Sequence, residues 1–375
     1  MCPLDPRNLT PDASLNRVRV MDLPNLAVDA GVKGKTGYEL VSAATLARLI
    51  RPYCSVFQLN PTLSDRDLNR AFDRCLSGDD GGSNPSVRKV AAAIAQRIGR
   101  NLGYLLLTLK RGDWVNREAR SEWDASYWDH WAGINNIRLG GGLVKGGLGW
   151  HIKRHVLAVF EEAGITDFGV VVSPYGGDLP LVGVARLAPP DIETALVFDM
   201  GGTMIKRGCA IYDDYRRELL ELRWLPPVPT QWEKFERTLP SGEDAAAALL
   251  GHIVATISDT WRTIRANSNL PLTRVVCISM ASYLRDGHPM IQRGAYGYLR
   301  LLTQNLQSEL VLQLIRHLGV VDMQLVHDGT AAAAVYAGGL DAAVITIGTA
   351  LGIGFPPPEK EVCRISEDFV IAALE

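Results

Sequence analysis

Apolar positions along the chain alternate between strand-like runs and helical spacings, and this alternation predicts the fold class. Short apolar runs with the length of buried strands occur at Phe168–Val172, Ala195–Met200, Val275–Met280, Met323–Val326 and Ala342–Ile347. Apolar spacings of three and four residues predict helices at Tyr38–Arg51, Ser86–Leu109, His151–Ala163, Gly242–Ala266 and Leu306–Leu318, and the segment Gly78–Pro85 is a predicted loop. Strands that alternate with helices are typical of an α/β fold.

Composition narrows the classes of protein that need to be considered. The chain has 375 residues, enough for two domains of ordinary size, with 39 Lys+Arg against 41 Asp+Glu. This balance gives no signal for nucleic-acid binding, and no apolar run approaches the ~20 residues that a membrane span needs. Met1–Asp5 lacks the features of a signal peptide. The six cysteines contain no CxxC pair, so we expect a cytoplasmic protein with reduced thiols that binds neither nucleic acid nor membrane.

One apolar strand runs into a turn that is suited to phosphate chemistry. Asp199 ends this run and is followed by Gly201, Gly202 and Thr203. Glycines let a backbone approach an anion and point its N–H groups at it. Asp199 could hold Mg²⁺ through water, because this ion favours few carboxylates together with phosphate oxygens. The alternative is a β-hairpin turn that needs positive φ angles.

Two further glycine clusters follow apolar strands in the same way. Gly348, Thr349 and Gly352 follow the run Ala342–Ile347, and Gly140, Gly141 and Gly142 follow Ile137-Arg-Leu139. The second cluster could admit a flat base or a phosphate, or could only allow close packing of a helix on a strand.

Asp328 is the candidate catalytic group. It stands where the apolar run Met323–Val326 opens into a helix of small residues. The carboxyl end of a strand is where α/β proteins bind ligands, and it is a rigid place for a general base. Asp328 could equally cap the helix, and the two roles are compatible.

Three other patterns favour structural explanations. Gly34-Lys35-Thr36 lacks the first glycine of a P-loop, and His151 and His155 lack a third metal ligand. Trp114, Trp123, Trp128 and Trp131 lie close together in the sequence, which favours packing or a subunit contact, as in a homodimer, over a sugar platform.

Together, these segments resemble the acetate and sugar kinase/Hsp70/actin superfamily, and within it the ROK-type sugar kinases. Asp199-Met-Gly-Gly-Thr203 with Gly208 is similar to the phosphate-1 motif, and Thr346-Ile-Gly-Thr-Ala-Leu-Gly-Ile-Gly354 to phosphate-2. Val326-His-Asp328-Gly-Thr-Ala-Ala332 resembles the stretch that carries the catalytic aspartate. Gly140–Gly142, followed by Val170–Ser173 and Asp178–Ala188, resembles the adenosine motif and its closing strand and helix.

The order of these motifs implies a circular permutation. The family has its adenosine motif after phosphate-2, whereas here it lies upstream of phosphate-1, and Pro189-Pro190 would join the old ends. The resemblance implies a two-lobed actin-like ATPase (ribonuclease H-like) fold that is circularly permuted. Residues 1–189 would form the adenosine-motif part of the second lobe, 190–330 the phosphate-1 and catalytic-aspartate lobe, and 331–375 the phosphate-2 part of the second lobe.

The resemblance implies an ATP-dependent phosphotransferase. ATP and Mg²⁺ would be the cofactors, Asp199 the metal site, Asp328 the general base, and the acceptor a hydroxyl of a sugar or other small molecule. Lys206 or Arg207 could meet phosphate charge or face solvent. The family's ExGH sugar motif and its zinc-binding cysteines are missing, which leaves two alternatives: a nucleotide-dependent switch without phosphotransfer, and a decayed nucleotide site.

Overall fold

The chain divides into two compact units, each built from segments that are distant in the sequence. The structure, a computed structural model, describes residues 4–77, 85–291 and 293–374, so most of the loop predicted at 78–85 lies outside the described residues. Unit 1 consists of residues 1–4, 12–177 and 341–353, and unit 2 of residues 5–11, 178–340 and 354–375. Compared with the predicted boundaries, residues 5–11, 178–189, 331–340 and 354–375 fall in unit 2.

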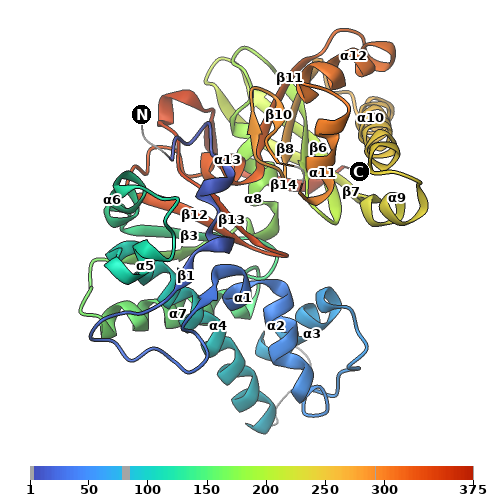
Figure 1. Cartoon of the computed structure of the whole chain (residues 1–375). Helices are drawn as coiled ribbons and strands as arrows, with labels where there is room; N and C mark the ends of the chain where they lie inside the picture. Colours follow the sequence, from blue (N-terminus) through green and yellow to red (C-terminus); the bar gives the residue numbers. More distant parts are fainter. Residues whose placement is uncertain (1–3, 78–84, 292, 375) are drawn as a thin grey trace. The chain divides into compact units, whose positions relative to one another are not determined.

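Unit 1 contains a four-stranded sheet in the order β13-β12-β3-β4. Its strands are β3 Asn136–Gly140, β4 Gly169–Val172, β12 Ala342–Ile347 and β13 Leu351–Gly354. β12 pairs in parallel with β3, and β3 with β4. Parallel neighbours need a crossover, which α7 (Gly147–Glu162) provides between β3 and β4. β12 and β3 therefore lie side by side although about half of the chain separates them (Figure 1).

Helices make up the rest of unit 1. They are α1 Gly37–Val41, α2 Ala43–Ile50, α3 Asp65–Ser77, α4 Pro85–Arg111, α5 Trp114–Glu118 and α6 Ala125–Gly133, with the short strands β1 Arg19–Val20 and β2 Lys35–Thr36. The helix predicted at Tyr38–Arg51 is broken at Ser42, whose side chain accepts the N–H of Thr45 and caps α2. The long helix was predicted almost to its ends, and it packs closely on α7, where Gly99 faces Ile152.

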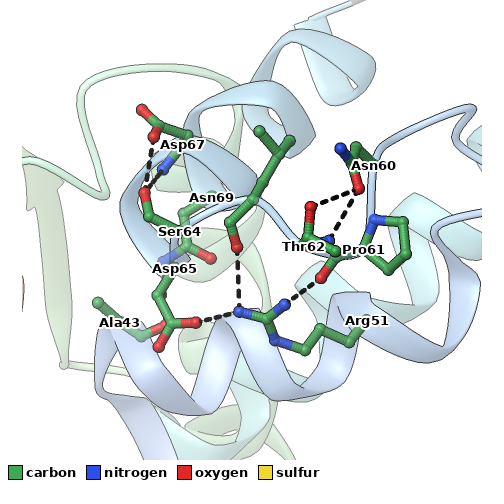
Figure 2. Close-up of polar contacts among 10 residues, drawn as sticks. Ala43, Arg51, Asn60, Pro61, Thr62, Ser64, Asp65, Asp67 and Asn69 are labelled. Carbon is green, nitrogen blue, oxygen red and sulfur yellow. Dashed lines mark hydrogen bonds and ion pairs between the residues drawn. The ribbon is translucent and has the colours of Figure 1, made fainter.

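The connection between α2 and α3 is held by one arginine (Figure 2). The Arg51 guanidinium donates to the carbonyl of Leu63 at 3.2 Å and to Asp65 Oδ1 at 2.6 Å, and it also reaches the carbonyl of Pro61. Ser64 and Asp67 then cap the start of α3. An arginine that satisfies several loop carbonyls fixes the path of an irregular segment, which gives this connection a structural role.

The tryptophan cluster belongs to the interior of unit 1. Trp123, Trp128 and Trp131 are 5% exposed or less, and the Tyr127 ring stacks on Trp123. Trp114 is 69% exposed. The packing interpretation therefore holds for three of the four rings.

Unit 2 contains a six-stranded sheet in the order β11-β8-β5-β6-β7-β14. The strands are β5 Thr194–Met200, β6 Met204–Asp213, β7 Glu218–Pro229, β8 Val275–Met280, β11 Asp322–His327 and β14 Arg364–Ala373. β5, β6 and β7 form an antiparallel meander, while β8 and β11 run parallel to β5. The carboxyl ends of β5, β8 and β11 therefore lie at one edge of the sheet.

Helices pack on this sheet through a common apolar core. They are α8 Leu179–Arg186, α9 Trp232–Thr238, α10 Gly242–Asn267, α11 Gly294–Gly297, α12 Leu306–Leu318 and α13 Asp328–Ala334, and a small hairpin joins β9 Leu284–Arg285 to β10 His288–Pro289. Phe198, Ile253, Ile278 and Leu314 are completely buried in this core. The α/β class predicted from the sequence is thus confirmed. In the described part of the chain, every helix is too short or too polar to cross a membrane.

Candidate functional site

Asp199 ends β5 as a buried, paired carboxylate. It is 6% exposed, and its Oδ2 accepts from Lys206 Nζ at 3.1 Å. Ser279 at the end of the neighbouring β8 places its hydroxyl 3.5 Å from Asp199 Oδ1. Burial raises the pKa of Asp199, and the Lys206 ammonium opposes that rise. The charge of Asp328 also raises the pKa of Asp199, so these two predicted site residues belong to one electrostatic cluster.

Lys206 links two carboxylates of unit 2. It lies opposite Asp199 in the β5–β6 pair, and its Nζ is 3.6 Å from Asp178 Oδ1. Burial lowers the pKa of Lys206, but Asp199 and Asp178 raise it more, so the net shift is upward. The Lys206 side chain is 30% exposed. Arg207 points to other partners, namely Asp259 at 2.7 Å and the carbonyl of Pro226, so of the two cations only Lys206 belongs to this cluster.

The turn after Asp199 is a β-hairpin turn, but neither Gly201 nor Gly202 has a positive φ. The N–H of Gly201 donates to the carbonyl of Met204 at 3.1 Å, so it is already used inside the turn. The carbonyl of Gly201 accepts from Thr230 and Tyr296. Among the described residues, the N–H groups of Gly202 and Thr203 have no partner, and both residues are exposed. These two residues are therefore the available donors for an anion in this turn.

Asp328 opens α13, with one backbone donor and one imidazole nitrogen close to its carboxylate. Its Oδ1 accepts the N–H of Gly329 at 2.7 Å, and His327 Nε2 lies 3.0 Å from the same oxygen. Burial of its surroundings raises the pKa of Asp328 to about 6, although 28% of its side chain is exposed. An accessible carboxyl with a raised pKa is a better proton acceptor near neutral pH than an ordinary one.

His327 is a neutral neighbour of Asp328. It is 8% exposed, and burial lowers its pKa to about 3. Its ring stacks on Tyr283 at 4.4 Å between centroids. A proton on Nε2 would suit an ionised Asp328, because an ionised carboxylate only accepts. His327 is thus an uncharged contact of the carboxylate at 3.0 Å.

The helix that carries Asp328 is fixed in its middle and at its last turn. The buried guanidinium of Arg186 donates to the carbonyls of Ala334 and Val335 at 2.7 Å, which satisfies the last turn of α13. A Cβ on Gly183 of α8 would lie 1.7 Å from the carbonyl oxygen of Ala331. The two helices can therefore touch only because residue 183 is glycine.

In unit 1, the structure brings two of the predicted glycine clusters together. Gly141 has φ +96°, and a Cβ there would lie 2.5 Å from the carbonyl oxygen of Ile347. The N–H of Leu143 donates to that same carbonyl at 3.2 Å. Gly142 is exposed and has open space around it. The close-packing explanation therefore accounts for Gly141, while Gly142 leaves room for a ligand.

The turn after β12 shows a similar division of roles. The N–H of Gly348 donates to the carbonyl of Ala350 at 3.2 Å, and a Cβ on Gly352 would lie 2.2 Å from Thr346 Oγ1. Asn16 binds both the N–H and the carbonyl of Leu351. Thr349 is exposed, and its N–H has no partner among the described residues. Gly348 and Gly352 shape this turn, and Thr349 is the candidate donor.

The sequence did not identify several members of the site. Asp178 was noted only as part of a closing helix, and Ser279, Tyr283 and His327 had no predicted role. These residues converge from separate elements, so no local motif marks them. His151 and His155 are neighbours with ring centroids 6.4 Å apart. Within the described ranges, no group of three His, Cys, Asp or Glu side chains could hold a metal ion.

The site fits Mg²⁺ and ATP in a limited way. Mg²⁺ keeps most of its waters and takes one or two carboxylates together with phosphate oxygens, so it does not need a cluster of protein ligands. Asp199 offers one oxygen beside its Lys206 contact, and the charges of Asp328 and Asp178 both act on it. The open N–H groups of Gly202 and Thr203 are suited to phosphate oxygens.

No protein-family model, no curated protein and no solved structure matches this chain. What the molecule does therefore has to be argued from its own residues and their geometry.

Proposed function

We propose that this protein is an ATP-dependent phosphotransferase that acts on a hydroxyl of a sugar or sugar-like small molecule. The observation that carries the proposal is the arrangement at the carboxyl edge of the six-stranded sheet. There, a paired carboxylate, Asp199, ends β5, and an accessible carboxyl with a pKa of about 6, Asp328, follows β11. One group is suited to hold cation and phosphate charge, and the other is suited to accept a proton.

The sheet topologies support the actin-like, ribonuclease H-like fold. In unit 2 an antiparallel meander β5-β6-β7 is continued beyond β5 by the parallel strands β8 and β11, as the proposed fold requires. In unit 1, β12 comes from the end of the chain and pairs in parallel with β3 from its first half. A circular permutation accounts for this pairing, because it moves neighbouring strands to opposite ends of the sequence.

Asp328 has the central role in the proposed mechanism. ATP bound with Mg²⁺ would supply the phosphoryl group. The Asp328 carboxylate would accept the proton of the acceptor hydroxyl, while that oxygen forms its bond to the γ-phosphorus and the bond to the ADP leaving group breaks. His327 holds the carboxylate in place. The N–H groups of Gly202 and Thr203 and the Lys206 ammonium would stabilise charge on the phosphate oxygens.

A nucleotide-dependent switch without phosphotransfer is the second candidate. One observation favours it: the N–H groups of Gly201 and Gly348 are bonded within their own turns, so fewer donors remain for a transition state than the motifs alone predict. A switch would bind ATP and change conformation without consuming it.

The test is turnover of the purified full-length protein with ATP, Mg²⁺ and a panel of sugars and polyols, measured as acceptor-dependent ADP release. Asp328→Asn should lower kcat by roughly 10²–10⁴-fold, while the ATP-induced rise in Tm should persist. Asp322→Asn is the matched control, because Asp322 is exposed at the other end of β11, and it should leave kcat unchanged. Full turnover in Asp328→Asn would remove Asp328 from the base role, and an ATP-induced Tm shift without any turnover would favour the switch.

A further inference from the structure

Unit 2 has a cavity that is separate from the proposed phosphotransfer site. Its volume is about 530 Å³, within the range of small-molecule pockets. It is lined by Arg216, Arg217, Glu359, Lys360, Val362 and Arg364. None of these residues belongs to the cluster of Asp199 and Asp328.

Two segments that are distant in the sequence build this cavity. Arg216 and Arg217 belong to the turn between β6 and β7, and the N–H of Arg216 donates to Asp213 Oδ1 at 2.9 Å. The other lining residues lie just before and at the start of β14. The N–H of Arg364 donates to the carbonyl of Arg217 at 3.1 Å. The parallel pairing of β14 with β7 therefore fixes the four cationic residues around one space.

The lining is strongly cationic although the chain as a whole has a formal net charge of -2. Four lining side chains are cationic and one, Glu359, is acidic. Arg216 has a long 3.7 Å contact with Asp213, and the nearby Glu361 binds Arg7. Among the described residues, Lys360 and Arg364 have no ion pair. Cations gathered in this way attract anions and repel one another until an anion binds.

The backbone of Arg217 has a conformation that few non-glycine residues adopt. Its φ is +55°, in the left-handed region, which costs a non-glycine residue of order 1 kcal/mol. Its Nε is buried and has no hydrogen-bond partner. Burial raises the pKa of the Cys363 thiol, and the Arg217 guanidinium beside it opposes that rise. Because that Nε is buried, Arg217 contributes positive charge to the lining and not a directed N–H donor.

We propose that this pocket binds a small molecule with at least two anionic groups, such as a diphosphate or a phosphorylated carboxylate. Four cations against one carboxylate exceed what a singly charged group can neutralise, which favours a multivalent ligand. Lys360 and Arg364, which are exposed, provide the N–H donors for this ligand, and Arg216 and Arg217 add charge.

The test is titration calorimetry of the full-length protein with inorganic pyrophosphate in the absence of Mg²⁺. We expect saturable binding that weakens roughly tenfold or more in Lys360→Ala/Arg364→Ala, because the change removes two cationic donors from the lining. Both side chains are exposed, so the fold should tolerate the change. Glu359→Gln should tighten binding, a gain that structural damage would not produce.

Two controls separate this pocket from the proposed phosphotransfer site. Lys206→Met and Arg237→Ala should bind pyrophosphate like the unmodified protein, since Lys206 would contact phosphate only at the proposed phosphotransfer site and Arg237 is an exposed residue of α9 paired with Glu233. Absence of saturable binding at millimolar pyrophosphate would overturn the proposal. An affinity that is unchanged in both Lys360→Ala/Arg364→Ala and Glu359→Gln would also overturn it.

Discussion

The turn after β5 and the turn after β12 start from the same sequence pattern, yet they are built differently. Each follows a buried strand, and in each the N–H of the first glycine, Gly201 or Gly348, bonds back within its own turn. The β5 turn is flanked by the charged pair of Asp199 and Lys206. The β12 turn has no charged side chain and is instead fitted against a neighbouring glycine, Gly141.

This difference shows what a glycine cluster can and cannot tell. In the β12 region, Gly141 and Gly352 are required because backbone or side-chain atoms occupy the place of a Cβ. In the β5 turn, Gly202 has open space, so a ligand and not packing would explain it. The β5 turn is therefore the candidate for ligand binding, and the glycines of the β12 region serve mainly for close packing.

The largest expected effect tests this distinction directly. Gly141→Ala would put a Cβ 2.5 Å from the Ile347 carbonyl oxygen at a φ of +96°, so we expect the free energy of unfolding to fall by about 3 kcal/mol or more. Gly202→Ala and Gly142→Ala meet no atom within 4 Å and should change stability by less than about 1 kcal/mol. Urea unfolding measures all three. Equal stabilities for the three variants would refute the packing explanation.

The next effect concerns the charged pair. Lys206→Met would leave Asp199 buried without its cation, and we expect a loss of about 2 kcal/mol, below that of a fully buried pair because the Lys206 side chain is 30% exposed. The double variant Asp199→Asn/Lys206→Met should recover part of this loss. Arg237→Ala breaks an exposed pair and should cost less than about 0.5 kcal/mol. If Lys206→Met were as stable as Arg237→Ala, the interaction between Asp199 and Lys206 would make no net contribution to stability.

The core of the fold could be predicted from the sequence because its elements are continuous in pattern. The run Val275–Met280 and the helix Leu306–Leu318 were predicted with the bounds that the structure has. The strands β6, β7 and β14 were missed, since polar and charged residues interrupt them: Lys206 and Arg207 lie within β6, and β14 is largely exposed. A strand with one solvated face near the edge of a sheet has no continuous apolar run to mark it.

The site could be predicted only where a local motif marks it. Asp199 and Asp328 follow apolar strands, so their positions were evident, and the structure places them in one electrostatic cluster. Asp178 and Tyr283 reach the cluster from other elements, and no spacing rule connects them to it. Which N–H groups remain open depends on the hydrogen bonds inside each turn, and these follow from three-dimensional geometry alone.

His327 makes a smaller, pH-dependent contribution to stability. Burial lowers its pKa to about 3, whereas an ordinary histidine has a value of about 6.5. Below about pH 6.5, His327 is protonated in the unfolded chain but stays neutral in the folded chain. The free energy of unfolding therefore decreases as the pH falls, by at most ~1.4 kcal/mol per pH unit.

The matched variant for this effect is His327→Asn, which has no group that titrates in this range. Its stability relative to the unmodified protein should improve as the pH is lowered from 7 to 5, as measured by urea unfolding at each pH. A difference that stays constant over this range would mean that folding leaves the pKa of His327 unchanged.

The smallest expected effect is a shift in the pH dependence of catalysis, which tests how His327 acts on Asp328. Only ionised Asp328 accepts a proton, so kcat/KM should rise with pH through a midpoint near the pKa of about 6. A proton on His327 Nε2, which lies 3.0 Å from Asp328 Oδ1, would stabilise the ionised form. His327→Phe keeps a ring against Tyr283 but removes this donor, so the midpoint should move upward by about one pH unit. His327→Asn, which keeps an N–H donor, should reverse part of the shift. A ring that served only for packing would leave the midpoint unchanged in both variants, and the contact of His327 with Asp328 would then have no part in setting the pKa of the base.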